Sequence, residues 1–441
     1  MPELTEKDRQ LFPVSSQLDS DGVISAGGCS LKDLAARFDT PLYVYDEATI
    51  RYMCREFTGG FRDAYERSNI AYSSKAFTNP SLAKVIAEEG LHMDVVTGGE
   101  LAVAKAAAFP ADRLNFHGNN KGRRELEEAI EYGIGRITID SFHEIDLLNE
   151  VAAQLGVTQK VLLRVSPSVD PHTHLLTTTG VLDSKFGFSI ETGAAEDALK
   201  QAVTAENLDV AGLHFHLGSP IFELEPYSQA IDYVLKFAAE MRERHGLDLR
   251  EFIPGGGFAI GYVGDQLPPP VSAYAREIST AVRSGCDRYG LDEPELLVEP
   301  GRAIVGRAGV AIYEVGGIKR IPGVRTYVSV DGGMGDNIRP ALYGSRYTVR
   351  RVTDPYSTPQ ERVTVVGKYC ESGDYLARDV DLPVLDTGEL LCTPASGAYS
   401  VPMASNYNMA VRPAIVMVND GEARLIRRRE TYEDLLATSL V

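Results

Sequence analysis

Eight short runs of apolar and β-branched residues recur through the middle of the chain, and an amphipathic helical pattern separates most neighbouring runs. A strand that alternates with a helix predicts parallel pairing, and about eight such units predict a closed (β/α)₈ barrel. An open doubly wound sheet is the structural alternative, but its glycine fingerprint follows an early strand, whereas the triple glycine here comes late. The eight runs are 69–74, 92–96, 114–117, 136–140, 161–165, 210–216, 251–254 and 295–299.

The sequence changes in character after about residue 309. Short strand-like runs separated by Gly, Pro and Asp now replace the helical patterns, which predicts an antiparallel β domain. Strand-like residues near 41–45 suggest that the N-terminal segment completes this domain. The predicted fold class is therefore α/β, with a TIM-like barrel at 46–309 and a β domain built from 1–45 and 310–441.

Composition narrows the classes of partner. The net charge of -18 over 441 residues argues against nucleic acid or an anionic membrane surface. No apolar run is long enough to span a membrane, and the N-terminus does not resemble a signal peptide. The five cysteines are scattered without CxxC spacing, which fits a cytoplasmic location and predicts neither disulfides nor a zinc site. The histidines are not spaced as metal ligands either, so we expect no metal.

Polar residues stand at the carboxyl ends of most predicted barrel strands, where the active face of such a barrel lies. One such residue on each strand would be ordinary capping, but a lysine, carboxylates, histidines and a glycine turn together indicate a site. The residues are Lys75, Asp94, His117, Asp140, Arg164, His214, His216, Gly255, Gly256, Gly257, Glu299 and Arg302. Asp94 and Glu100 are interpreted as supporting or helix-capping groups.

Lys75 directly follows the first run, at the inner end of a strand that is predicted to be buried. Burial disfavours the charged form of a lysine, and an uncharged amine can form a Schiff base with an aldehyde. A lone lysine would more often extend to solvent. The Gly255–Gly257 turn suits a phosphate, although a plain tight turn explains three glycines equally well. Ser219 could give the same phosphate a hydroxyl. An aldehyde, a phosphate and an aromatic ring together describe pyridoxal phosphate.

Several motifs resemble the alanine-racemase-fold (type III) pyridoxal-phosphate decarboxylases. They are Tyr72-Ser73-Ser74-Lys75-Ala76, Asp94-Val95-Val96-Thr97-Gly98-Gly99-Glu100, His214-Phe215-His216-Leu217-Gly218-Ser219, Gly255-Gly256-Gly257 and Glu299-Pro300-Gly301-Arg302. Further motifs resemble the diaminopimelate decarboxylase branch: Thr179-Gly180 with Ser184-Lys185-Phe186-Gly187-Phe188, Asp331-Gly332-Gly333-Met334 with Arg339-Pro340-Ala341-Leu342-Tyr343, Cys370-Glu371-Ser372-Gly373-Asp374, and Ser405-Asn406-Tyr407-Asn408. The resemblance covers nearly the whole chain in order.

The resemblance implies a role for each matching residue. Lys75 holds the cofactor aldehyde, His216 stacks on its ring, and Glu299 pairs with the ring nitrogen. The phosphate is held by Ser219, Gly255, Gly256, Gly257 and the backbone after Glu299, with Gly301 and Arg302 as cofactor-binding residues. Arg302, Arg339 and Tyr343 bind the distal carboxylate of the substrate, and Glu371 faces its distal ammonium. Tyr407 touches cofactor and substrate, and Cys370 donates the proton that replaces CO₂.

In this family Cys370 comes from a neighbouring subunit, so the resemblance also implies a homodimer with shared active sites. Two residues depart from the usual pattern: Phe77 stands in place of an asparagine and Pro220 in place of a glutamine. Both bear on substrate preference and neither removes a group that the chemistry needs.

The implied reaction is decarboxylation of meso-2,6-diaminopimelate to L-lysine, the last step of lysine biosynthesis. One alternative is a related decarboxylase of ornithine, arginine or a D-amino acid. A diamine tail would need an acid where Arg302 and Arg339 stand, so the two arginines favour diaminopimelate. A racemase needs a second base and gives no reason for Cys370-Glu371. A non-enzymatic paralogue would tend to lose Lys75 or the glycine turn, and both are present.

Overall fold

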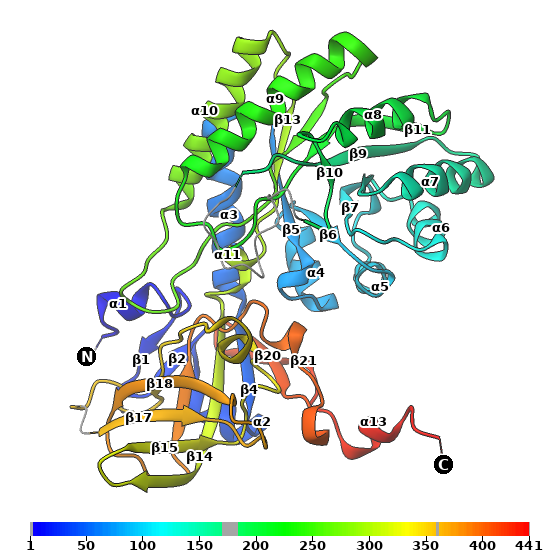
Figure 1. Ribbon diagram of the computed structural model, residues 1–441. Helices are drawn as coiled ribbons and strands as arrows, with labels where there is room; N and C mark the ends of the chain where they lie inside the picture. The colour runs from blue at the N-terminus through cyan, green and yellow to red at the C-terminus, as the bar shows by residue number, and fades with distance from the viewer. Residues whose placement is uncertain (1–2, 170–183, 359–360, 441) are drawn as a thin grey trace. The chain divides into compact units, whose positions relative to one another are not determined.

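A computed structural model describes residues 3–169, 184–358 and 361–440 of the chain (Figure 1). Its contacts divide the chain into two compact units. We call Met53–Ala259 with Pro269–Gly301 the barrel unit, and Met1–Tyr52 with Ile260–Pro268 and Arg302–Val441 the β unit. The domain boundaries drawn from the sequence at 45/46 and 309/310 stay a prediction.

The barrel unit contains a closed ring of eight parallel strands. Each strand pairs with the next, and the ring closes where β13 pairs with β5 and β8 pairs with β9. The short strand β10 (Phe188–Ser189) adds to β9 outside the ring. The strands are β5 (Ser68–Ser73), β6 (His92–Val95), β7 (Leu114–Phe116), β8 (Arg136–Ile139), β9 (Gln159–Ser166), β11 (Leu208–His214), β12 (Glu251–Ile253) and β13 (Glu295–Val298). The predicted barrel is confirmed.

Helices follow the barrel strands and lie outside the ring (Figure 1). They are α4 (Pro80–Glu88), α5 (Gly98–Ala106), α6 (Arg123–Tyr132), α7 (Phe142–Leu155), α8 (Ala194–Thr204), α9 (Glu225–His245) and α10 (Val271–Tyr289). The sequence analysis missed one long helix, α3 (Glu47–Ala64). Its residues Ile50, Cys54, Phe57 and Phe61 are fully buried and recur every three or four positions, the spacing of one helical face.

Two apolar clusters support the barrel unit. Inside the ring, Ala71, Leu162, Ile253 and Leu297 from four strands pack together. Next to the strands, the Phe258 ring lies 5.0 Å from Phe57, 6.1 Å from Phe61, 6.1 Å from Tyr227 and 5.2 Å from Tyr274, measured between centroids. Phe258 directly follows the glycine turn, so its packing in this cluster holds the turn in position.

The β unit is built on a sheet in the order β18-β17-β15-β14-β4-β20-β21, to which β19 and β16 add. A small sheet of β1 (Gln17–Leu18), β2 (Ile24–Ala26) and β3 (Cys29–Ser30) accompanies it. The main strands are β4 (Leu42–Asp46), β14 (Gly309–Ile321), β15 (Arg325–Val330), β16 (Arg350–Arg351), β17 (Glu361–Val366), β18 (Tyr375–Leu382), β19 (Leu390–Thr393), β20 (Ala414–Asn419) and β21 (Glu422–Arg427). Short helices in this unit are α1 (Glu6–Arg9), α2 (Leu31–Phe38), α11 (Arg302–Val305), α12 (Arg339–Tyr343) and α13 (Tyr432–Leu436).

The N-terminal segment completes this sheet, as predicted, because the fully buried β4 lies between β14 and β20. The sheet is mixed, which differs in part from the antiparallel prediction. β4 runs parallel to β20, and β15 runs parallel to β17. Both parallel pairs join strands that are not neighbours in sequence, so the direction of pairing is not readable from the local pattern.

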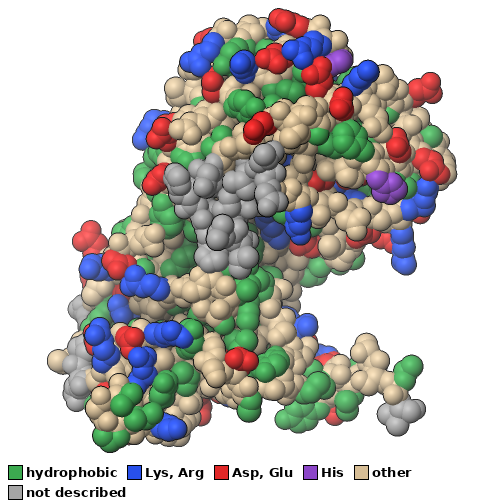
Figure 2. Space-filling model, in the orientation of Figure 1, with side chains coloured by type: hydrophobic (Ala, Val, Ile, Leu, Met, Phe, Trp, Pro, Cys, Tyr) green, Lys and Arg blue, Asp and Glu red, His purple; other side chains and the backbone are tan. Residues whose placement is uncertain are grey.

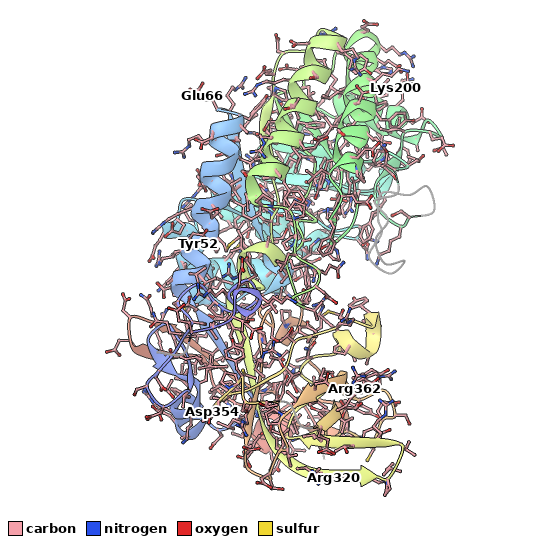
Figure 3. The ribbon with its side chains drawn as sticks, turned by 90° about the vertical axis from the view of Figure 1, so that its left-hand side faces the viewer. Tyr52, Glu66, Lys200, Arg320, Asp354 and Arg362 are labelled. Atoms are coloured by element: carbon pink, nitrogen blue, oxygen red, sulfur yellow. The ribbon has the colours of Figure 1, made fainter. Side chains whose placement is uncertain are left out.

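Lysine, arginine and acidic side chains are interspersed on the surface that Figure 2 shows. Arg320 of β14 and Arg362 of β17 are exposed on the β-unit sheet (Figure 3), and Arg320 pairs with Glu361 at 3.1 Å. Within the described ranges, none of the helices combines the length and the apolar character that crossing a bilayer requires.

We expect Phe258→Ala to lower the free energy of unfolding by about 3–5 kcal/mol, since it removes the ring at the centre of the aromatic cluster. Urea denaturation followed by circular dichroism measures this loss. Phe142→Ala is the matched control, because the Phe142 side chain is 42% exposed and its loss is expected to cost under about 1 kcal/mol. Equal losses for both variants would contradict the packing role of Phe258.

Candidate active site

The Gly255–Gly257 turn follows β12 and has a backbone that side chains would obstruct. Gly255 and Gly257 have φ values of +78° and +104°, in the region that favours glycine. At Gly256, a Cβ atom would lie 2.1 Å from the carbonyl oxygen of Glu299. The Glu299 N–H donates to the Gly255 carbonyl at 3.0 Å. The turn therefore packs tightly against Glu299, the residue that follows β13.

His216 and the loop around Ser219 lie beside the same turn. The Gly256 N–H donates to His216 Nδ1 at 3.3 Å, and the Ile221 N–H donates to the Gly257 carbonyl at 2.8 Å. Burial, and then the charge of Lys75, lower the pKa of His216 well below its usual value, so its imidazole is neutral. The structure thus brings His216, the Ser219 loop, the glycine turn and Glu299 together at one end of the barrel.

Glu299 is buried between two histidines. Its Oε1 lies 3.1 Å from His117 Nε2, and its Oε2 lies 3.2 Å from His214 Nε2. His117 Nε2 also lies 3.6 Å from Asp94 Oδ1. Asp94 is held in turn by Ser73 Oγ at 3.0 Å and by Asn115 Nδ2 at 3.0 Å. The ends of five strands, β5, β6, β7, β11 and β13, are joined in this polar network.

The pKa values of this network diverge. Burial alone would raise the pKa of Glu299, but the charge of His117 and the hydrogen bonds from His117 and His214 outweigh it and hold that pKa well below its usual value. Burial opposes the charge on His117 too, but Glu299 and Asp94 raise its pKa to about 9. Burial lowers the pKa of His214 to about 4. At neutral pH Glu299 is therefore ionised, His117 is charged and His214 is neutral.

Lys75 lies in a short 3₁₀ turn, Ser74–Ala76, between β5 and α4. The sequence analysis placed it at the inner end of a buried strand, but β5 ends at Ser73 and the Lys75 side chain is exposed. Burial of the lysine therefore does not explain its chemistry. The residues on either side of this lysine pack closely against Gly301. A Cβ atom added to Gly301 would lie 2.9 Å from the Ser73 side chain and 3.1 Å from that of Ala76.

These groups fit an aldehyde cofactor that carries a phosphate and a basic ring nitrogen. The consecutive backbone N–H groups of a glycine turn suit a phosphate, and the ionised Glu299 can hold a protonated nitrogen. An exposed amine at Lys75 is accessible to an aldehyde.

The ligand atoms of His117, His214 and Glu299 also lie within 4.8 Å of one another, a grouping that could hold a metal ion.

In the β unit, two of the predicted substrate residues lie around one tyrosine. Arg302 Nη1 donates to the Tyr262 hydroxyl at 2.5 Å, and the Arg339 guanidinium lies 4.7 Å from the centre of the Tyr262 ring. Both arginines are buried. Tyr343 is half-buried and lies one turn beyond Arg339 on α12. The structure thus brings Arg302 and Arg339 together.

Cys370, Glu371 and Tyr407 form a second group in the β unit, and all three are exposed. The Cys370 N–H bonds to Asn408 Oδ1 at 3.2 Å, and the Tyr369 and Tyr407 rings lie 6.0 Å apart. Asp374 supports this loop, since its carboxylate accepts from the N–H groups of Met334 at 2.7 Å and Tyr369 at 2.8 Å.

The sequence analysis gave no role to three residues that the structure places among these groups. His117 was noticed only as a polar strand end, and its contact with Glu299 crosses the barrel. Tyr262 and Tyr347 were not singled out. The one sequence signal for Tyr262 was its position five residues after the glycine turn, which places it near the predicted cofactor site. The Thr179-Gly180 motif lies outside the described residues.

Comparison with known proteins defines the class of enzyme. The family model described as the pyridoxal-binding domain of pyridoxal-dependent decarboxylases matches residues 50–306, more than half of the chain. The chain is thus a decarboxylase whose cofactor is pyridoxal phosphate. This cofactor agrees with the groups at the end of the barrel, which fit an aldehyde, a phosphate and a basic ring nitrogen.

Individual relatives narrow this class. The diaminopimelate decarboxylase of Bacillus subtilis (strain 168) is 44% identical over 426 residues, or 97% of this chain and 97% of that protein. The crystal structure of the diaminopimelate decarboxylase from M. jannaschii has a TM-score of 0.91 at 34% identity and covers 97% of this chain and 98% of that one. The same enzyme in complex with L-lysine gives a TM-score of 0.88 at the same identity and coverage. The chain belongs to the diaminopimelate decarboxylase family.

We expect Gly256→Ala to weaken pyridoxal phosphate binding at least tenfold, because the added Cβ meets the Glu299 carbonyl and displaces the turn. Absorbance titration of the apoprotein with the cofactor measures this. Gly59→Ala is the control: Gly59 lies in α3, and beyond the neighbouring backbone of that helix nothing lies within 4 Å of its added Cβ, so cofactor affinity is expected to stay unchanged. Unchanged affinity in Gly256→Ala would count against the turn as the phosphate site.

Proposed function

We propose that this chain converts meso-2,6-diaminopimelate to L-lysine and CO₂, the last step of lysine biosynthesis. The observation that carries the substrate assignment is the buried pair Arg302 and Arg339, because a guanidinium fork matches a carboxylate. Diaminopimelate keeps a second carboxylate after the first has left, whereas ornithine and arginine have none at that end. The family membership supports the same substrate.

Pyridoxal phosphate, when bound, supplies a ring that accepts the electron pair left by the departing carboxylate. The residues of the barrel unit bind and orient it. Lys75 offers its amine to the cofactor aldehyde, and Glu299 holds the proton of the ring nitrogen. His216 stacks on the ring as a neutral imidazole. Gly255, Gly256, Gly257, Ser219 and the backbone at Gly301 hold the phosphate.

The residues of the β unit bind the substrate and complete the proton transfer. Arg302, Arg339 and Tyr343 bind the distal carboxylate, and Glu371 binds the distal ammonium. Tyr407 contacts cofactor and substrate. Cys370 donates a proton to the carbon that has lost CO₂, so that one C–C bond breaks and one C–H bond forms.

The enzyme works as a homodimer in which the Cys370 loop of one subunit completes the site of the other. The exposure of Cys370, Glu371 and Tyr407 supports this, because reactive groups at the surface of one chain need a neighbour to exclude water. A cytoplasmic location is supported by the five cysteines, which are all free thiols.

The direct test is to incubate the cofactor-loaded protein with meso-diaminopimelate and to measure lysine and CO₂. Ornithine and arginine are tested as alternative substrates in separate, parallel reactions. We expect turnover of diaminopimelate and at most trace turnover of the other two. Faster turnover of ornithine or arginine would overturn the substrate assignment.

We expect Lys75→Ala to abolish both the visible absorption band of the bound cofactor and decarboxylation, because the variant has no amine at this position. Absorbance spectra and CO₂ release measure the two effects. Lys84→Ala, which removes an exposed lysine on the following helix α4, should leave both unchanged. A Lys75→Ala protein that kept both properties would refute the assignment.

We expect inactive Lys75→Ala and Cys370→Ala proteins to restore activity to roughly a quarter of wild type when they exchange subunits in equal amounts. Random pairing makes half of the dimers hybrid, and each hybrid has one intact site and one doubly defective site. CO₂ release after dissociation and reassociation measures the recovery. Lys75→Ala taken through the same treatment alone is the control. An inactive mixture with proven subunit exchange would show that each site is built within one chain.

A further inference from the structure

The two buried arginines of the β unit are surrounded by tyrosines. Arg339 Nη1 donates to the Tyr347 hydroxyl at 2.6 Å, and its guanidinium lies 4.7 Å from the centre of the Tyr262 ring. Arg302 donates to the Tyr262 hydroxyl and lies 4.7 Å from the centre of the Tyr399 ring. The Tyr262 and Tyr347 rings are 5.1 Å apart. Tyr262 thus touches both arginines.

Arg339 has an uncompensated charge. In residues 3–169, 184–358 and 361–440, its charge and hydrogen-bond partners are the tyrosines Tyr262 and Tyr347 and no carboxylate, and no acceptor meets its buried Nε. The side chain is only 5% exposed. A buried cation without an anion is costly, and aromatic rings stabilise it without neutralising it. The charge therefore remains available to an anionic ligand.

The Tyr262 hydroxyl accepts a hydrogen bond and has a proton of its own to donate. Among the described residues it is an acceptor from Arg302, and it donates to none of them. Burial alone would raise the pKa of Tyr262, but Arg302 and Arg339 outweigh it and lower that pKa. The two guanidiniums therefore make this phenol a stronger hydrogen-bond donor than an ordinary tyrosine.

We propose that Tyr262 is a specificity-determining residue that donates a hydrogen bond from its hydroxyl to the carboxylate bound by Arg302 and Arg339. The inference rests on the proposed function, which places the distal carboxylate of the substrate at these arginines. The same hydroxyl holds the Arg302 guanidinium in place before the ligand arrives. A ligand without this carboxylate gains nothing from Tyr262 and leaves the charge of Arg339 uncompensated.

The binding of two small molecules distinguishes this specific role from a general loss of structure in the variant. L-lysine, the expected product, keeps the distal carboxylate, and cadaverine is lysine without it. Calorimetric titration of the cofactor-loaded Tyr262→Phe protein should show roughly 10- to 100-fold weaker binding of L-lysine and unchanged binding of cadaverine, since one charge-assisted hydrogen bond is lost. Equal weakening of both ligands would overturn the specific role and indicate a structural one.

Tyr65→Phe is the matched control. Tyr65 is 1% exposed, and its hydroxyl donates to the Pro294 carbonyl at 2.7 Å in the barrel unit. The control variant loses a buried phenol hydroxyl in the same way, and we expect it to bind both ligands like the wild type. A cofactor band of normal intensity in both variants verifies that the cofactor site is intact.

Kinetics with meso-diaminopimelate then distinguish two kinds of failure. We expect Tyr262→Phe to raise KM roughly 10- to 100-fold with kcat within about threefold of wild type, because the distal carboxylate is remote from the bond that breaks. A wild-type KM in the variant would overturn the role of Tyr262 and leave the proposed function standing. Failure of the wild-type enzyme to turn over diaminopimelate would overturn the proposed function itself.

Discussion

The closure of the barrel by the pairing of β13 with β5 is the constraint on which the cofactor site depends. In this register Val298 faces Ile70, so the residues that follow both strands leave the ring side by side. The Ser73 N–H accordingly donates to the Pro300 carbonyl at 3.2 Å. Lys75 and Glu299, which are more than two hundred residues apart in sequence, are thereby positioned by adjacent strands. An open sheet would separate them.

Two short segments of chain each carry a group proposed to hold the cofactor and a group proposed to bind the substrate carboxylate. One segment begins at the Gly255–Gly257 turn and reaches Tyr262, and the other begins at Glu299 and reaches Arg302. The first group of each segment belongs to the barrel unit and the last to the β unit. The aromatic cluster around Phe258 packs the first segment, and the hydrogen bond between Glu299 and Gly255 joins it to the second.

Much of the barrel could be predicted from the sequence, because β-branched runs and polar strand ends are local signals. Features that depend on distant neighbours could not. The exposure of Lys75 depends on where β5 stops, and the pairing of His117 with Glu299 requires the closed ring. Gly59 and Gly60 lower the helix propensity of α3, whose stability comes from its buried face. The assignments of individual residues to roles rest on resemblance and stay predictions.

The N-terminal strand β4 is connected to the Cys370 loop through buried polar groups. The Tyr43 hydroxyl donates to Asp336 Oδ2 at 3.0 Å, Asp336 Oδ1 accepts from the Gly333 N–H at 2.8 Å, and the next residue binds Asp374. β4 itself needs β14 and β20 as partners. Synthesis runs from the N-terminus, so β4 is made before the barrel strands, whereas β14 and β20 are made after them. The loop that carries Cys370 therefore acquires its supports only after the barrel strands have been made.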